Sequence, residues 1–196
     1  ALRWASNGYP VIIGSRNEEK ARKTAGELNG ILGEELIRGM ENAAAAKEAE
    51  INVLTVVQSA HQAAVTALKE DLQGKILIDA TAQISFPDPK PPAPPSAARR
   101  AQDILGEGVP VVAAFQNIPA HALKNLDKEL ESDVLVSADH REHAEIVMEL
   151  IQGAGMNSYY IGDLDMAITI EGLTAVLVKI NKFNDIKHAS VRIVGS

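Results

Sequence analysis

Short apolar runs alternate with helical segments along nearly the whole chain. The runs expected to be strands lie at residues 10–14 (PVIIG), 36–39, 51–57 (INVLTVV), 75–80 (KILIDA), 109–115 (VPVVAAF), 133–137 and 157–161. The helices expected between them lie at residues 18–29, 42–49, 60–70, 96–105 and 139–152. Because each strand is a continuous apolar run without polar alternation, we expect a mostly parallel sheet that helices cover on both faces.

The C-terminal part of the chain has a different pattern. Residues 163–183 form a long, mostly apolar helical stretch, and residues 189–194 (ASVRIV) form an expected final strand. A helix that is apolar on most sides either crosses the core or pairs with a second subunit. We therefore predict an α/β fold, with a Rossmann-like, doubly wound domain over 1–162. The helix and strand of 163–196 would pack on that domain or form the interface of a homo-oligomer, in the simplest case a homodimer.

Composition narrows the classes of function. The chain has 196 residues and no cysteine, which excludes disulfides, thiolate metal sites and cysteine nucleophiles. A net charge of -7 argues against nonspecific nucleic-acid binding, which needs a basic face. No apolar run approaches the roughly 20 residues that a membrane helix needs. We expect a cytoplasmic protein that binds a small molecule and neither nucleic acid nor membrane.

Two further features leave alternatives open. Most of the nine prolines lie in residues 84–95, so this segment must be a loop, either a surface connection or a flap over a site. His140 and His143 lie three positions apart on one face of an expected helix. No third ligand accompanies them in the sequence, so we expect no metal site.

The segment GSRNEEK, residues 14–20, lies where a strand turns into a helix. Ligands of open α/β sheets bind outside the carboxyl ends of the strands. If Asn17 caps the helix, Lys20 lies in its first turn, where a cation is unfavourable unless an anion binds there. Ser15, Arg16 and Lys20 would then form a site for the 2′-phosphate of NADP. The alternative is that Arg16 and Lys20 are solvated surface charges. No G-x-G-x-x-G motif follows any expected strand.

Several segments together resemble the F420-dependent NADP oxidoreductases, which are NADPH-dependent reductases of the deazaflavin coenzyme F420. The matching segments are ALRWASNGYPVIIGSRNEEK, INVLTVVQSAH, GKILIDAT, SAARRAQDIL, VVAAFQNIPAHAL with LDKELESDVLVSAD, and EGLTAVLVKINKFNDIKHASVRIVG. The resemblance implies an oxidoreductase that transfers a hydride between NADP(H) and coenzyme F420. The family's glycine-rich opening is absent from the matching segments. We therefore expect the chain to begin roughly one strand and its turn later than the family does.

The resemblance also implies roles for particular residues. Three places are matched: the 2′-phosphate site, the loop beside the ribose and nicotinamide, and the segment where the nicotinamide and deazaflavin rings meet. The residues expected to bind the cofactor are Ser15, Arg16, Lys20, Val57, Gln58, Ser59, His61 and Ala120. The residues expected to bind the substrate are Phe115, Gln116, Asn117, Ile118 and Pro119. The chain departs from the family pattern at two places. The family often has Pro-Trp or Pro-Tyr where this chain has Val57-Gln58, and it usually has His where this chain has Gln116. Glutamine still donates and accepts hydrogen bonds but cannot titrate near neutral pH.

Hydride transfer between two such rings is the chemistry of the cofactors themselves, so the protein must align the rings and exclude water. The sequence contains no recognisable acid–base triad, and we assign no catalytic residue. Small side chains at Ala113, Ala114 and Ala120 would let a ring approach the backbone, or would serve packing alone. Two alternatives remain at this stage: an NADP-dependent imine or ketone reductase of a related Rossmann family, and a non-catalytic NADP-binding module.

Overall fold

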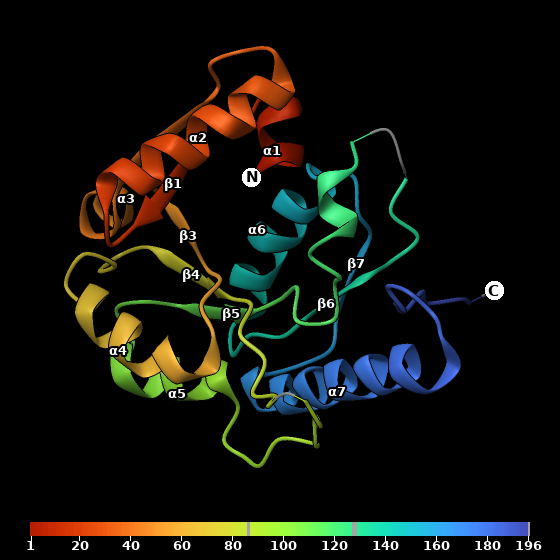
Figure 1. Cartoon of the computed structure of the whole chain (residues 1–196). Coiled ribbons are helices and arrows are strands. Elements are labelled where there is room, and N and C mark those ends of the chain that lie inside the picture. Colours follow the sequence, from red (N-terminus) through yellow and green to blue (C-terminus); the bar gives the residue numbers. More distant parts are fainter. Residues whose placement is uncertain (86, 127–128, 196) are drawn as a thin grey trace.

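A computed structural model describes residues 1–85, 87–126 and 129–195 of the chain (Figure 1). Short parallel strands and helices alternate, as the apolar runs predict. The strands are β1 (Val11–Ser15), β2 (Ile37–Glu41), β3 (Ile51–Leu54), β4 (Ile76–Asp79), β5 (Val111–Ala113), β6 (Val134–Val136) and β7 (Ser158–Tyr160). The helices are α1 (Leu2–Ser6), α2 (Glu18–Leu32), α3 (Asn42–Glu48), α4 (Gln58–Leu68), α5 (Ala97–Leu105), α6 (Arg141–Gln152) and α7 (Ala167–Asn184), with 3-10 turns η1 (Ala122–Lys124) and η2 (Leu164–Met166).

The strands pair in three parallel ladders, β1–β2, β3–β4–β5 and β6–β7. An isolated antiparallel bridge between Ala113 and Ser137 joins the ends of β5 and β6. In register, Ser15 of β1 lies beside Glu41 of β2, and Leu54 of β3 lies beside Asp79 of β4. The carboxyl ends of paired strands therefore lie side by side, which is the edge where ligands bind in folds of this class.

Helices cover both faces of the β3–β4–β5 ladder, as Figure 1 shows for α4 and α5 on one side and α6 on the other. One apolar cluster joins the ladder to α4 and α5 through Val65, Ala101 and Leu105, which are buried. The second joins it to α6 through Val147 and Ile151. This is the doubly wound arrangement predicted from the continuous apolar runs.

The first strand–helix–strand unit is held by local signals that the sequence carries. The side chain of Asn17 accepts a hydrogen bond from the backbone N–H of Lys20 at 3.1 Å, so Asn17 caps α2 as predicted. Gly33 ends the helix in the left-handed conformation, with φ at 74°. Gly39 of β2 lies so close to α2 that a Cβ atom there would overlap the backbone of Ala21 and Arg22. Close contact between α2 and β2 therefore requires glycine at this position.

The expected final strand at residues 189–194 is not formed. Asp185 and His188 take positive φ values of 52° and 61° and turn the chain after α7. The segment then makes one backbone bond to the neighbouring strand region, from Asp133 N–H to the carbonyl of Val191 at 2.9 Å. The N–H of Ile193 instead bonds the side chain of Asp133 at 2.6 Å, so no ladder can develop. Among the described residues, no helix is both long and apolar enough to cross a membrane.

Candidate functional site

The turn from β1 into α2 contains the predicted phosphate-binding residues. Ser15 is half-buried, and its Oγ accepts the N–H of Asn17 at 3.2 Å. Arg16 and Lys20 are exposed, and neither forms an ion pair within the described part of the chain. Arg22, on the same helix, bonds Glu18 at 2.6 Å. Two cations without partners at a helix N-terminus fit a bound phosphate, because the helix dipole and free N–H groups favour an anion there.

The loop after β3 leads directly into α4. Val57 is the residue before the helix, and its side chain is 71% exposed and makes no capping bond. Gln58 and Ser59 are exposed on the first turn of α4. His61 differs from its neighbours because it is 3% exposed and points into the protein. The loop therefore offers an exposed surface to a ligand, with a buried histidine behind it.

The partner of His61 is Asp79, the last residue of β4, which the sequence analysis did not single out. The His61 Nε2 atom lies 2.6 Å from the Asp79 Oδ2 atom, and both side chains are almost fully buried. The other carboxylate oxygen accepts the backbone N–H of Thr81 at 2.9 Å. An acidic residue at the end of the apolar run KILIDA was the available signal, since a carboxylate beside a core strand needs a buried partner.

The segment expected to meet the two rings starts at Phe115, whose φ of 75° turns the chain sharply after β5. Gln116 lies in the core, where its Nε2 atom donates to the carbonyl of Asp79 at 2.9 Å. Its Oε1 atom is buried and accepts no hydrogen bond from the described residues. An N–H donor of an incoming ring would satisfy this oxygen, so the residues present fit a bound heterocycle.

The remaining residues of this segment differ in exposure. Asn117 is buried and donates to the carbonyl of Asp133 at 2.8 Å, and Ile118 is also buried. Pro119 is half-buried and Ala120 is exposed. The structure therefore brings His61 and Gln116 together on Asp79, while Ser15, Arg16 and Lys20 lie on a separate strand–helix unit. Ala113 and Ala114, at 0% exposure, lie in the apolar clusters and serve packing.

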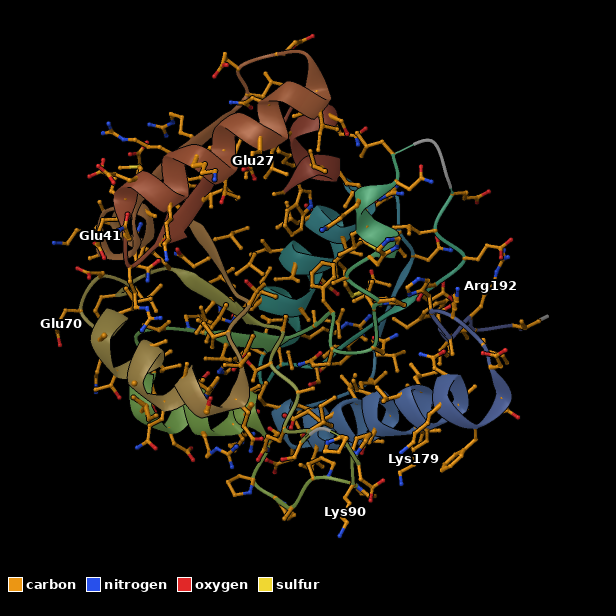
Figure 2. The ribbon with its side chains drawn as sticks, in the orientation of Figure 1. Glu27, Glu41, Glu70, Lys90, Lys179 and Arg192 are labelled. Carbon is orange, nitrogen blue, oxygen red and sulfur yellow. The ribbon has the colours of Figure 1, made fainter. Side chains whose placement is uncertain are left out.

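The proline-rich segment lies against α7. Asp88 bonds Lys179 at 3.0 Å, and this pairing lowers the pKa of the Asp88 carboxyl. Figure 2 shows Lys90 of the loop and Lys179 of α7 on the same side of the molecule. Gln83 Nε2 also donates to the carbonyl of Pro95 at 2.8 Å. Residue 86 of the loop lies outside the described residues. The Asp88–Lys179 pair ties the loop to the C-terminal helix.

A second group of polar contacts joins Arg99, at the start of α5, to the residue before His140 and to η2. Arg99 bonds both carboxylate oxygens of Asp139 at 2.7 Å and Asp165 at 2.8 Å. The Arg99 guanidinium holds the pKa of Asp139 below its usual range. Asp139 therefore makes a tertiary contact and does not cap α6, which begins after His140. His140 and His143 form an edge-to-face pair, and no group of three or more metal-ligating side chains occurs in the described chain.

The strand-end edge, the cationic turn and the two layers of helices define a Rossmann-like α/β protein, a class whose members bind nucleotides along that edge. The family model described as "NADP oxidoreductase coenzyme F420-dependent" matches residues 1–83. The chain is 37% identical to the F420-dependent NADP reductase of Methanothermobacter marburgensis, over 98% of this chain and 91% of that protein. It is 33% identical to the reductase of the same name from Methanocaldococcus jannaschii, over 98% and 91%. The chain therefore belongs to the F420-dependent NADP reductase family.

Solved structures agree on the fold. A crystal structure of a candidate F420-dependent NADP reductase from Arthrobacter sp. FB24 superimposes with a TM-score of 0.80 at 22% identity, covering 99% of this chain and 94% of that one. An imine reductase from Bacillus cereus gives a TM-score of 0.63 at 17% identity, covering 93% and 57%. At these identities the likeness shows the fold alone, so the imine or ketone reductase alternative gains no support beyond a shared architecture.

Proposed function

We propose that this chain is an NADP-dependent oxidoreductase that transfers a hydride between NADP(H) and coenzyme F420. In the reducing direction, NADPH loses a hydride and becomes NADP⁺, and the deazaflavin gains that hydride and one proton. The observation that carries the proposal is the pair of cations without ion-pair partners, Arg16 and Lys20, at the helix N-terminus of a chain in this family. They would hold the 2′-phosphate that distinguishes NADP from NAD.

The other residues would act by binding and orientation. The exposed turn into α4, with Val57, Gln58 and Ser59, would lie beside the ribose and nicotinamide. The segment 115–120 would lie where the two rings meet, with Gln116 Oε1 as an acceptor for an N–H of the bound ring. Hydride transfer is the chemistry of the two coenzymes, and the protein supplies alignment. Since both are intracellular redox carriers, we place the protein in the cytoplasm.

The test is NADPH oxidation by the natural full-length protein with the purified deazaflavin as acceptor. Turnover with NADPH and much slower turnover with NADH is the expected result. NADPH binding without turnover would leave a non-catalytic NADP-binding module. Turnover with cyclic imines or ketones in the absence of deazaflavin would replace the proposed acceptor.

We also propose that the C-terminal unit 163–196 contacts a second copy of the chain. Helix α7 packs one face on the domain, while Val176 is 49% exposed and Phe183 is 70% exposed. These two side chains lie seven positions apart and so share one face of the helix. An exposed apolar face of this kind favours a partner helix, and a homodimer supplies one.

We expect Val176→Glu combined with Phe183→Glu to convert the dimer into a monomer, because a symmetric interface would bury four new charges. Light scattering coupled to size-exclusion chromatography measures the mass. Ile31→Glu is the matched control, since Ile31 is 63% exposed on the distant helix α2 and should leave the mass unchanged. A wild-type protein that is monomeric at every concentration would contradict the dimer.

A further inference from the structure

Glu171 is a fully buried carboxylate in the second turn of α7. Its Oε1 atom accepts the backbone N–H of Ala97 at 2.7 Å, and its Oε2 atom accepts the backbone N–H of Gln83 at 3.1 Å. No cation pairs with it in the described part of the chain. Because Ala97 is the first residue of α5, the carboxylate lies at the positive end of that helix dipole.

The contacts of Glu171 belong to a closed ring of contacts between protein segments. This ring of contacts runs through the segment 115–120, which is proposed to meet the two coenzymes. Gln83 follows β4, whose last residue, Asp79, accepts the side-chain N–H of Gln116 at its carbonyl. The carbonyl of Gln116 accepts the hydroxyl of Thr174 at 2.8 Å. Thr174 lies one turn after Glu171 on the same face of α7. Helix α7 therefore holds the chain after β4 with Glu171 and the chain after β5 with Thr174.

We propose that Glu171 is a positioning residue for hydride transfer: its carboxylate fixes the chain after β4 against α7, and so fixes the segment 115–120. This inference rests on the proposed function. Orientation of the reacting groups dominates a reaction without acid–base chemistry, and a displacement of about 1 Å can cost roughly a hundredfold in rate. A loosened segment would still leave the turn from β1 to α2, with Arg16 and Lys20, intact for the 2′-phosphate.

The ionised form of Glu171 is the one that fits its partners. Both partners are N–H donors, and a carboxylate offers a strong, charged acceptor to each. A protonated carboxyl offers a weaker acceptor at its hydroxyl oxygen, and a glutamine amide directs a donor at one of the two N–H groups. Burial raises the pKa of Glu171, and the negative charge of Asp79 adds to this shift. We therefore expect the wild-type enzyme at low pH to behave like Glu171→Gln.

The charged groups on neighbouring elements have partners of their own. Asp79 of β4 is bonded to His61 of α4. On α5, Arg99 bonds Asp139 and Asp165, and Arg100 donates to the carbonyl of Pro95. On α7, Lys179 bonds Asp88.

The experiment compares Glu171→Gln with Glu149→Gln, an exposed glutamate of α6. We expect Glu171→Gln to lower kcat for deazaflavin reduction by roughly 10- to 100-fold, while the Kd for NADPH stays within about twofold of wild type. The fall of kcat toward acid pH should disappear in Glu171→Gln and remain in Glu149→Gln. An unchanged kcat, or an acid limb that persists in Glu171→Gln, would overturn the proposal.

Two further measurements keep the proposal testable if Glu171→Gln folds poorly or if the proposed function is wrong. Thr174→Val breaks the ring of contacts at its other end, so it should lower kcat without removing the acid limb. Hydrogen exchange of the amides of residues 115–120 needs no acceptor, and it should quicken in Glu171→Gln but not in Glu149→Gln. If hydrogen exchange of these amides is unchanged in Glu171→Gln, the ring of contacts does not hold the segment 115–120, and the proposal is overturned. A wild-type protein that transfers no hydride overturns the proposed function, whatever the exchange shows.

Discussion

Arg16→Ala is expected to weaken NADPH binding by roughly 10- to 150-fold, from the loss of about 1.5–3 kcal/mol of hydrogen bonding to a charged group. NADH lacks the 2′-phosphate, so its binding should change by less than about twofold. The physical reason is that Arg16 makes no ion pair within the described chain, so its guanidinium is available to a phosphate. Fluorescence titration of the full-length protein with each nucleotide measures both constants.

Arg22→Ala is the matched control for this prediction. Arg22 is an arginine of the same helix, but it bonds Glu18 and its side chain is 71% exposed. A surface pair of this kind contributes little, so the affinities for both nucleotides should stay near those of the wild type. Equal losses for NADPH and NADH in Arg16→Ala would remove Arg16 from the phosphate site.

Asp79→Ala is expected to lower the free energy of unfolding by roughly 3–5 kcal/mol, the usual cost of removing one member of a buried pair. The substitution leaves His61 Nε2 without its partner at 2.6 Å and the N–H of Thr81 without its acceptor. This is a large share of the roughly 5–15 kcal/mol by which such domains are stable. Urea denaturation followed by circular dichroism measures the change.

The control for Asp79 is Asp103→Ala, an exposed aspartate on α5 for which the expected change is within about 0.5 kcal/mol. His61→Ala combined with Asp79→Ala completes a double-mutant cycle that isolates the interaction of the pair. A loss below about 1 kcal/mol in Asp79→Ala would show that burial at this strand end contributes little to stability.

Local patterns were sufficient to predict most of the fold. Continuous apolar runs mark strands because both faces of the ladder are covered, and Asn17 marks the start of α2 because its side chain caps the helix. The prediction of a final strand is wrong because a strand forms only where a neighbouring strand pairs with it. The run ASVRIV has strand-forming residues, but Asp133 bonds Ile193 through its side chain, and the ladder ends there.

The candidate site was predictable only in part, for a similar reason. The cations of the first turn lie within one short segment, so the sequence indicates their proximity. The pairing of His61 with Asp79 depends on α4 folding back over the end of β4, which no local pattern specifies. Glu171 carried a weak signal, a lone acid in an apolar helix, but its two N–H partners come from distant segments. Such contacts appear only when the fold is known.

Isotope transfer shows whether the hydride passes directly from the nicotinamide to the deazaflavin. NADPH carrying deuterium at the transferring position of the nicotinamide is mixed with the full-length protein and oxidised coenzyme F420 in ordinary water, and the products are analysed by mass spectrometry. We predict that the reduced deazaflavin retains the deuterium, because the protein aligns the two rings and excludes solvent from the transfer. Reduced deazaflavin that contains only hydrogen from the solvent, or no reduction at all, would rule out direct transfer between the two coenzymes.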